Sequence, residues 1–575
     1  MRPPLTRLIV GGLFAVLAAC ASPAPPPASP GATPDIPTAA PASPAPPTPA
    51  EAPTTATLPP PSPTPAPRIF TLALPAAPTT LDPARAEDGA ALLITRHLYE
   101  GLTAFEPGAT RVRPALAESW QVTPGGLRWT FELRPGVTFS DGTPLTAEAA
   151  RQNFERWRTR TPPGPYTFWR LMFGGFAGQA DETGAPLSTV AAVTATSPST
   201  LVITLTRPDA ALPNTLAMPA FAIVNPTAWA DPGFGAPGAP SAGTGPFLLQ
   251  AWHPEGLLTL ARNPAYWGEP AKPEKLLFKT IPDDVQRLTA LQIGEVDGLP
   301  DLDPAHYDLP AQWPGLRVEF DPPLEVLYLG FNQARAPWGD LDCRRAVALA
   351  LDPARYARDL FPGDAEAADA MQPAGTWGYA APPEARARDV EQARALWQAC
   401  VTAQPAPQTI NLYVPPLSRP YLPDPAGLGA AVQADLAEAG IRVTIQSPDW
   451  TTQWLPDVQA GRADLFLLGW AGLNGDPDAF LCPLFCGENA AFNSDAQGRP
   501  IPPDETLAGL LRRARAVTDP AEREALYAQA HARIFESVPA LPLVARRSAW
   551  AFRADLAGTV PSPIEAVFFG LELRP

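Results

Sequence analysis

The residues that most often carry catalysis or bind metals are sparse in this chain of 575 residues, which has four histidines. His97 and His531 fall within predicted helices, and His253 and His306 have no neighbouring nucleophile and no second ligand at metal-binding spacing. The sequence contains no G-x-S-x-G elbow, no G-x-x-x-x-G-K-S/T loop, no H-E-x-x-H pair and no dinucleotide-binding fingerprint. We therefore expect a protein that is not an enzyme and that holds no metal or cofactor.

Candidate binding residues lie at the end of an apolar strand that is predicted over 463–470 and in the loop after it. Ligands of parallel sheets bind beyond the carboxyl ends of the strands, which makes Gly469 and Trp470 candidates. Trp470 is expected to stack on a ligand or to line a cleft. Asp476 is a further candidate, although an aspartate followed by Pro477 also fits the N-terminal cap of a helix.

The elements that position this loop alternate between strand and helix. They are predicted strands over 409–414, 441–445 and 463–470 and predicted helices over 428–439 and 451–460. This order, with short connections, is typical of a parallel sheet that is covered on both faces. The region 100–270 mixes strands and helices without regular order. Within it, Tyr166 and Trp169 lie in a stretch bounded by Gly and Pro, and we expect them to cap the pocket or to be core residues.

Strand patterns return near the C-terminus, over 539–545 and 549–552. If these strands rejoin the sheet of the first half, the chain crosses between two lobes at least twice. Two crossing strands form a hinge. We expect the crossings near 326–332 and near 539–544. Asn332, at the end of the first crossing, is a candidate for hydrogen bonding to a ligand main chain, and a structural role is the alternative.

The N-terminus predicts export from the cytoplasm. Arg2 and Arg7 form a short basic region. The apolar run that follows, over 8–17, is too short to be a permanent membrane span. Leu17-Ala18-Ala19-Cys20 resembles a bacterial lipobox, which implies a signal peptide over 1–19, cleavage before Cys20 and lipid on its thiol. An ordinary secretory peptide is the alternative. We expect an extracytoplasmic protein that lipid on Cys20 anchors to the bacterial cell membrane.

The segment that follows, 20–67, is predicted to be a tether. Nineteen of the 47 residues in 21–67 are proline, and the segment has almost no apolar surface to bury. The composition of the whole chain also restricts its partners, because 42 basic against 58 acidic residues give a formal net charge of −16. This charge argues against a nucleic-acid partner.

Several segments of the folded part occur in the order of a known family. They are Leu116–Trp120, Trp129–Val137, Phe139–Pro144, Gly243–Phe247, Arg262–Trp267, Gly330–Asn332, Arg344–Val347 with Ala350–Asp352, and Gly469–Trp470 with Asp476–Pro477. Together they resemble the family 5 extracytoplasmic solute-binding proteins, the peptide and nickel group of ABC importers. The resemblance runs from about Thr71 to Pro563 and covers nearly all of the folded region.

The resemblance implies an α/β fold, a two-lobed periplasmic-binding-protein clamshell (type II, cluster C-like) with an extra subdomain in the first lobe. On this basis we expect lobe I over 68–325 with the subdomain at about 109–210, lobe II over 326–540, and a return to lobe I over 541–575. The implied function is capture of a peptide-like or other small solute by a monomer that delivers it to the transmembrane subunits of an ABC permease. A secreted cell-surface hydrolase and a non-transport ligand sensor on the same fold are the alternatives.

The resemblance also raises a question about the ligand. Peptide binders of the family commonly carry Gly-Trp-x-x-Asp, in which the Asp pairs with the α-ammonium of the ligand, but Leu473 holds that position here. A desolvated ammonium without a partner costs several kcal/mol. Either another acid, Glu87, Asp476 or Asp478, takes this role, or the ligand is not held by an amine.

Four further cysteines are predicted to form disulfides, since an even set is typical of extracytoplasmic proteins. Three connectivities are possible, and we favour Cys343 with Cys400 and Cys482 with Cys486. A zinc site made by all four cysteines is the alternative, although the pair spacing is not C-x-x-C.

Overall fold

The computed structural model describes residues 68–573 except 241, 254, 362, 385, 404–408, 487–503 and 565. The predicted signal peptide, the predicted lipidation site Cys20 and the predicted tether lie outside the described residues. Within the described part of the chain, no helix combines the length and the apolar composition that crossing a bilayer requires. The described residues form three main sheets.

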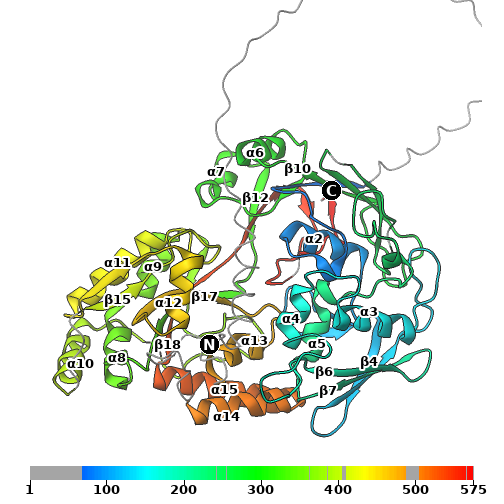
Figure 1. Cartoon of the computed structure of the whole chain (residues 1–575). Coiled ribbons are helices and arrows are strands. Elements are labelled where there is room, and N and C mark those ends of the chain that lie inside the picture. The colour runs from blue at the N-terminus through cyan, green and yellow to red at the C-terminus, as the bar shows by residue number, and fades with distance from the viewer. Residues whose placement is uncertain are drawn as a thin grey trace, which may run out of the picture. The chain divides into compact units, whose positions relative to one another are not determined.

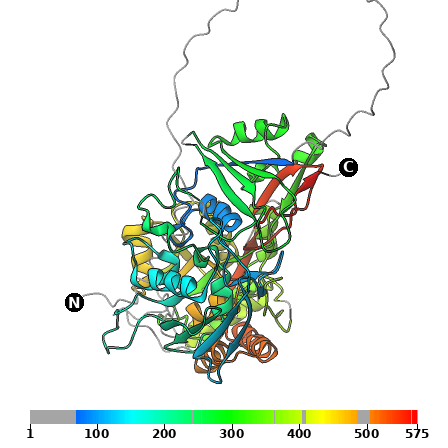
Figure 2. The same ribbon diagram turned by 90° about the vertical axis from the view of Figure 1, so that its right-hand side faces the viewer.

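The first sheet has seven strands in the order β12-β19-β11-β1-β10-β9-β8 and forms the centre of lobe I (Figures 1 and 2). Its strands are β1 (Ile69–Leu74), β8 (Phe247–Trp252), β9 (Leu257–Arg262), β10 (Lys275–Thr280), β11 (Gly298–Leu299), β12 (Leu316–Phe320) and β19 (Ala549–Arg553). β1 runs parallel to β10 and β11, and the other pairs are antiparallel. The start, the middle and the end of the described chain therefore share one sheet.

The second sheet is antiparallel and has four strands in the order β4-β5-β7-β6; we call the body around it the subdomain. Its strands are β4 (Ala117–Val122), β5 (Arg128–Leu133), β6 (Val190–Ala195) and β7 (Thr200–Leu205). The helices α3 (Ala147–Thr159) and α4 (Thr167–Phe173) contribute Phe154, Trp157 and Trp169 to its core. Thr146 is the N-cap of α3, and its side chain accepts a hydrogen bond from the Ala149 backbone N–H.

The third sheet has six strands in the order β14-β18-β13-β17-β15-β16 and forms the centre of lobe II (Figure 1). Its strands are β13 (Glu325–Phe331), β14 (Ala365–Ala367), β15 (Ile410–Tyr413), β16 (Val443–Gln446), β17 (Leu465–Ala471) and β18 (Ala540–Arg546). The predicted parallel arrangement is confirmed for β15 with β16 and β17. The sheet as a whole is mixed, because β13 pairs antiparallel with β17 and β18.

Helices cover both faces of this third sheet, because residues of its central strands alternate between two cores. Leu465 and Leu467 face a core with α8, α9, α10 and α11, and Phe466 and Leu468 face a core with α13, α14 and α15. The bounds are α8 (Leu341–Ala350), α9 (Pro353–Leu360), α10 (Val390–Ala403), α11 (Pro425–Glu438), α13 (Pro477–Phe485), α14 (Glu505–Ala516) and α15 (Pro520–Ser537).

The chain crosses between the two large sheets twice, at positions that differ from the prediction. β12 ends at Phe320 and β13 begins at Glu325, while β18 ends at Arg546 and β19 begins at Ala549. The crossings are therefore 321–324 and 547–548, whereas the expected crossings near 326–332 and 539–544 lie inside lobe II. The hydrogen-bonded ladder between β13 and β18 explains the difference, because it holds both strands within one sheet. The return to lobe I accordingly comes after Arg546 and not at 541.

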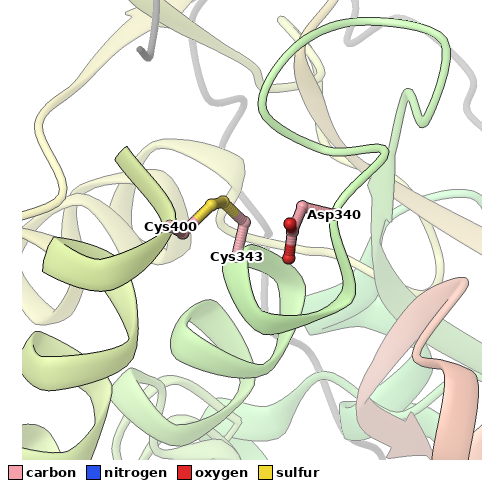
Figure 3. Close-up of side chains that lie close together, drawn as sticks. All are labelled: Asp340, Cys343 and Cys400. Atoms are coloured by element: carbon pink, nitrogen blue, oxygen red, sulfur yellow. A yellow bond between two sulfur atoms is a disulfide. The ribbon is translucent and has the colours of Figure 1, made fainter. Parts of the chain in front are cut away.

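The cysteines lie in the two pairs that the sequence favours. Cys343 and Cys400 lie side by side with their Cα atoms 5.6 Å apart, as Figure 3 shows, and the Cα atoms of Cys482 and Cys486 are 4.7 Å apart. The two pairs belong to cores on opposite faces of the third sheet, so the four sulfur atoms do not converge on one zinc site. Asp340 lies beside the first pair.

A buried ion pair joins the subdomain to lobe I. Arg156 of α3 binds Asp82, which lies just after β1, and each side chain is only 2% exposed. The guanidinium also lies over the ring of Trp229, 5.0 Å from its centroid. Removing one member of a buried pair leaves the other charge desolvated and unpaired.

Asp82→Asn is therefore expected to lower the free energy of unfolding by about 3–5 kcal/mol, measured by urea denaturation. Glu148→Gln is the matched control on the same helix, because Glu148 pairs with Arg151 at a side-chain exposure of 52%. Exposed pairs contribute at most about 1 kcal/mol. Equal effects of the two substitutions would show that the buried pair of Asp82 and Arg156 does not stabilise the contact between the subdomain and lobe I.

Candidate ligand-binding site

The candidate site lies at the end of the lobe II sheet that adjoins the two crossings, and we call this end of the sheet the floor of the site. Here β13 and β17 pair through Val326 with Trp470 and through Leu327 with Gly469. The buried ring of Tyr421 lies directly on Gly469, since a Cβ atom on that glycine would be 2.2 Å from the ring. Gly469 is thus required by close packing against Tyr421, and no larger residue fits without displacing the ring.

Arg419 is a buried cation beside this floor. A pair of backbone hydrogen bonds with Leu422 fixes its turn, and its guanidinium lies 4.1 Å from the ring centroid of Trp450. The side chain makes no hydrogen bond or ion pair with any described residue, and its Nε is buried without a partner. Burial lowers the pKa of Arg419. A planar guanidinium that lacks a counter-ion is suited to bind a carboxylate through two hydrogen bonds.

Glu325 is the second ionisable group at this floor. It is the first residue after the crossing 321–324, it is half-buried, and it has no hydrogen-bond or ion-pair partner among the described residues. Desolvation raises its pKa to about 7, and the positive charge of Arg546 opposes that shift. Arg546 itself is paired with Asp364 at 2.7 Å.

The charges of Glu325 and Arg419 both act on Tyr421. Burial raises the pKa of Tyr421; the charge of Arg419 opposes this shift and the charge of Glu325 adds to it. The two charged groups form no ion pair with each other. The floor therefore carries one acid and one base, both close to Tyr421 and both without a protein partner in the described chain.

The acids that follow β17 are already paired, which corrects the expectation that Asp476 contacts a ligand. Asp476 is fully buried, caps α13 by accepting from the Asp478 backbone N–H, and accepts two hydrogen bonds from Arg523 at 3.0 and 2.8 Å. The alternative N-cap interpretation is thus confirmed. Asp478 in turn is paired with Arg515 at 2.8 Å. Neither carboxylate is left to hold a ligand ammonium.

Trp470 and Asn332 do not share one site. Trp470 is 5% exposed, packs in the core with Phe480, and donates from Nε1 to the Ala479 carbonyl oxygen at 2.9 Å. Only a small edge of its ring can reach a ligand. Asn332 is 1% exposed and lies beyond the far end of β13, where its Oδ1 accepts from the Ala334 backbone N–H. The structure gives Asn332 the structural role that was its alternative.

The site residues that were predicted in lobe I and in the subdomain do not lie together in one site either. Tyr166 and Trp169 are buried in the subdomain core, which corrects the expectation that they cap a pocket. Glu87 accepts a hydrogen bond from the hydroxyl of Thr167. Leu473 packs against the same subdomain core. The position at which the family resemblance places an acid is therefore held by an apolar side chain with apolar neighbours.

A cavity of about 550 Å³ lies between the subdomain and lobe II. Its lining includes Thr110, Arg111, Trp377 and Glu524, and it contains none of the predicted site residues. Arg111 and Glu524 form an ion pair at 2.7 Å, and the Trp377 backbone N–H donates to the Thr110 hydroxyl. Because its charged groups are paired with each other, we place the candidate site at the floor described above.

Sequence reasoning missed both unpaired ionisable groups. The signal for Glu325 was present, because one acid precedes an otherwise uninterrupted apolar strand over 326–331. Arg419 lies in a turn before Pro420, and nothing in its local sequence distinguishes it from a solvated surface arginine. Its burial against Trp450 depends on the tertiary packing.

The comparisons with known proteins agree with this architecture. The family model for bacterial extracellular solute-binding proteins, family 5 Middle, matches residues 111–492. The chain is 29% identical to a dipeptide-binding protein of Escherichia coli (strain K12) and 34% identical to di/tripeptide-binding protein 4 of Pseudomonas aeruginosa (strain UCBPP-PA14). Each match covers 81% of this chain and 87% of the relative.

The fold is similar to the structure of HbpA2 from Haemophilus parasuis, with a TM-score of 0.79 and 25% identity, over 88% of this chain and all of that chain. A two-lobed α/β fold is thus common to both proteins. The chain belongs to family 5 of the bacterial extracellular solute-binding proteins.

Proposed function

We propose that this protein is the lipid-anchored substrate-binding protein of an ABC importer, which captures a peptide-like or other small solute between its lobes and delivers it to a membrane permease. Family membership and the names of the relatives, which are dipeptide- and di/tripeptide-binding proteins, support this proposal. The observation that carries it is Arg419, a buried cation that has no counter-ion among the described residues. The next residue, Pro420, accepts a hydrogen bond from Arg546, which precedes the crossing 547–548.

The mechanism follows from a population shift. A ligand that contacts both lobes only when they are close together stabilises that arrangement by its differential contact energy. Lobe II contributes Arg419, which binds the anionic group of the ligand, for instance the carboxylate of a short peptide. Lobe I and the subdomain move together, because the buried pair of Asp82 and Arg156 links them.

The organisation of the chain belongs to the same proposal. We assign 1–19 to a signal peptide, 20–67 to a tether that begins with the lipidated Cys20, and about 109–210 to the subdomain. Lobe II runs between the two crossings, at 321–324 and 547–548. In the oxidising extracytoplasmic compartment the two cysteine pairs form disulfides, and the protein acts as a monomer.

Denaturation of the purified chain from Arg68 onward is expected to release small molecules that carry a carboxylate, with free peptides among them, as identified by mass spectrometry. Arg419 needs an anionic partner, and a tightly bound ligand remains with the protein during purification. Release of exclusively uncharged or cationic solutes would contradict the assigned role of Arg419. Hydrolysis of an added peptide would instead favour the alternative of a cell-surface hydrolase.

Arg419→Gln is expected to weaken binding of the dipeptide Ala-Phe by about 30-fold or more, because loss of one partner of a buried hydrogen-bonded charge pair costs about 2 kcal/mol or more. Isothermal titration calorimetry measures the change. The free variant is expected to be at least as stable as the parent, since the substitution removes an unpaired buried cation.

Arg512→Gln serves as the control for that experiment, because Arg512 is exposed on α14 and pairs with Glu505. It is expected to leave the affinity unchanged. Binding of Ala-Phe by Arg419→Gln with the affinity of the parent would remove Arg419 from the site.

Cys20→Ser is expected to move the protein from the membrane fraction to the soluble extracytoplasmic fraction, because the lipid that the thiol carries is lost. Cell fractionation followed by immunoblotting measures the distribution. An unchanged membrane association would show that the protein is not held by lipid on Cys20.

A further inference from the structure

Glu325 is distinguished from the acids around it by the absence of a partner. Asp364 accepts from Arg546 and from the hydroxyl of Tyr307, and Asp321 accepts from the indole of Trp550 at 2.7 Å. The carboxylate of Glu325 makes no such contact with any described residue. An unpaired carboxylate in a partly desolvated position is unfavourable in its charged form, unless a ligand supplies a cation.

The place of Glu325 in the fold directs it toward the ligand. It is the first residue of β13 and therefore lies directly after the crossing 321–324, where the two lobes meet. Every other residue of β13 is buried, whereas Glu325 retains some exposure. Its neighbour on β17, Ala471, follows Trp470 at the carboxyl end of that strand. Ligands of α/β sheets bind beyond the carboxyl ends of parallel strands, and β17 runs parallel to β15.

Glu325 also complements Arg419. Both groups act on the pKa of the same tyrosine, Tyr421, yet they are not paired with each other. A ligand with an ammonium and a carboxylate satisfies both groups at once, whereas a simple anion leaves Glu325 without a partner.

We propose that Glu325 pairs with the ammonium group of the ligand whose carboxylate binds Arg419, so that the substrate class is a zwitterion such as a short peptide with a free amino terminus. This inference rests on the proposed function. It accounts for a ligand amine although Leu473 is apolar and Asp476 and Asp478 are bound by arginines.

The test compares the dipeptide Ala-Phe with N-acetyl-Ala-Phe, which keeps the carboxylate and lacks the ammonium. Calorimetric titration of the parent protein is expected to show at least a 10-fold preference for Ala-Phe. Glu325→Gln is expected to lose that preference through weaker binding of Ala-Phe, with the affinity for the acetylated peptide unchanged. Glu366→Gln, an exposed acid on β14 of the same sheet, is the control and is expected to retain the preference.

The pH dependence gives a second readout. The charge of Arg546 acts on Glu325, and the charges of Glu325 and Arg419 both act on Tyr421; of these four groups, Glu325 has its pKa close to 7. Its carboxylate becomes protonated as the pH falls through about 7. Binding of Ala-Phe is therefore expected to weaken between pH 8 and pH 6 in the parent but not in Glu325→Gln.

The outcomes separate the two proposals. If the parent binds both peptides equally, or if Glu325→Gln lowers both affinities by the same factor or neither, the role of Glu325 is overturned while peptide binding stands. If the parent binds neither peptide, the proposed peptide function fails and this inference fails with it. Thermal unfolding of each variant shows whether the fold is retained, and an unfolded Glu325→Gln leaves the parent's preference and its pH dependence as the deciding measurements.

Discussion

The pairing of β13 with β18 on one side and β17 on the other is the constraint on which the rest of the structure depends. β13 is the first strand of lobe II and β18 is the last, so their ladder brings the two crossings to one end of the sheet. The same ladder places Glu325 beside those crossings and lets Tyr421 pack on Gly469. The hinge and the candidate site are thus consequences of one strand arrangement, since both lie where the chain enters and leaves lobe II.

The contacts of the subdomain with lobe I differ in kind from its contacts with lobe II. Toward lobe I it shares a hydrophobic core and the buried pair of Asp82 and Arg156. Toward lobe II it packs against Leu473 and makes polar contacts, such as the exposed pair of Arg111 and Glu524 and the hydrogen bond from Asn474 to Thr215. Exposed pairs and single hydrogen bonds contribute little, whereas a broken buried pair is costly. Movement between the lobes is therefore expected to occur at the polar contacts and to leave the hydrophobic core intact.

Residues of the loop after β17 show how local patterns mislead about binding. Trp470 follows an apolar strand at the position where ligands usually bind, yet its ring fills the core and its indole N–H is bonded to Ala479. Asp476 has the sequence of an N-cap and serves as one, while Arg523 occupies both its oxygens. The sequence showed acids near a strand end but not that arginines from two later helices neutralise them. Burial and pairing decide whether a polar residue is available to a ligand.

By itself, the sequence determined the order of strands and helices in the second half and the family motifs, because each depends on local periodicity or on short segments read along the chain. Tertiary structure alone decided which charges remain free. Asp476 and Arg523 are 47 residues apart, Asp82 and Arg156 are 74 apart, and Arg419 finds no carboxylate at all among the described residues. Such pairings arise from the packing of separate elements, and the balance between desolvation and pairing exists only once those elements are in contact.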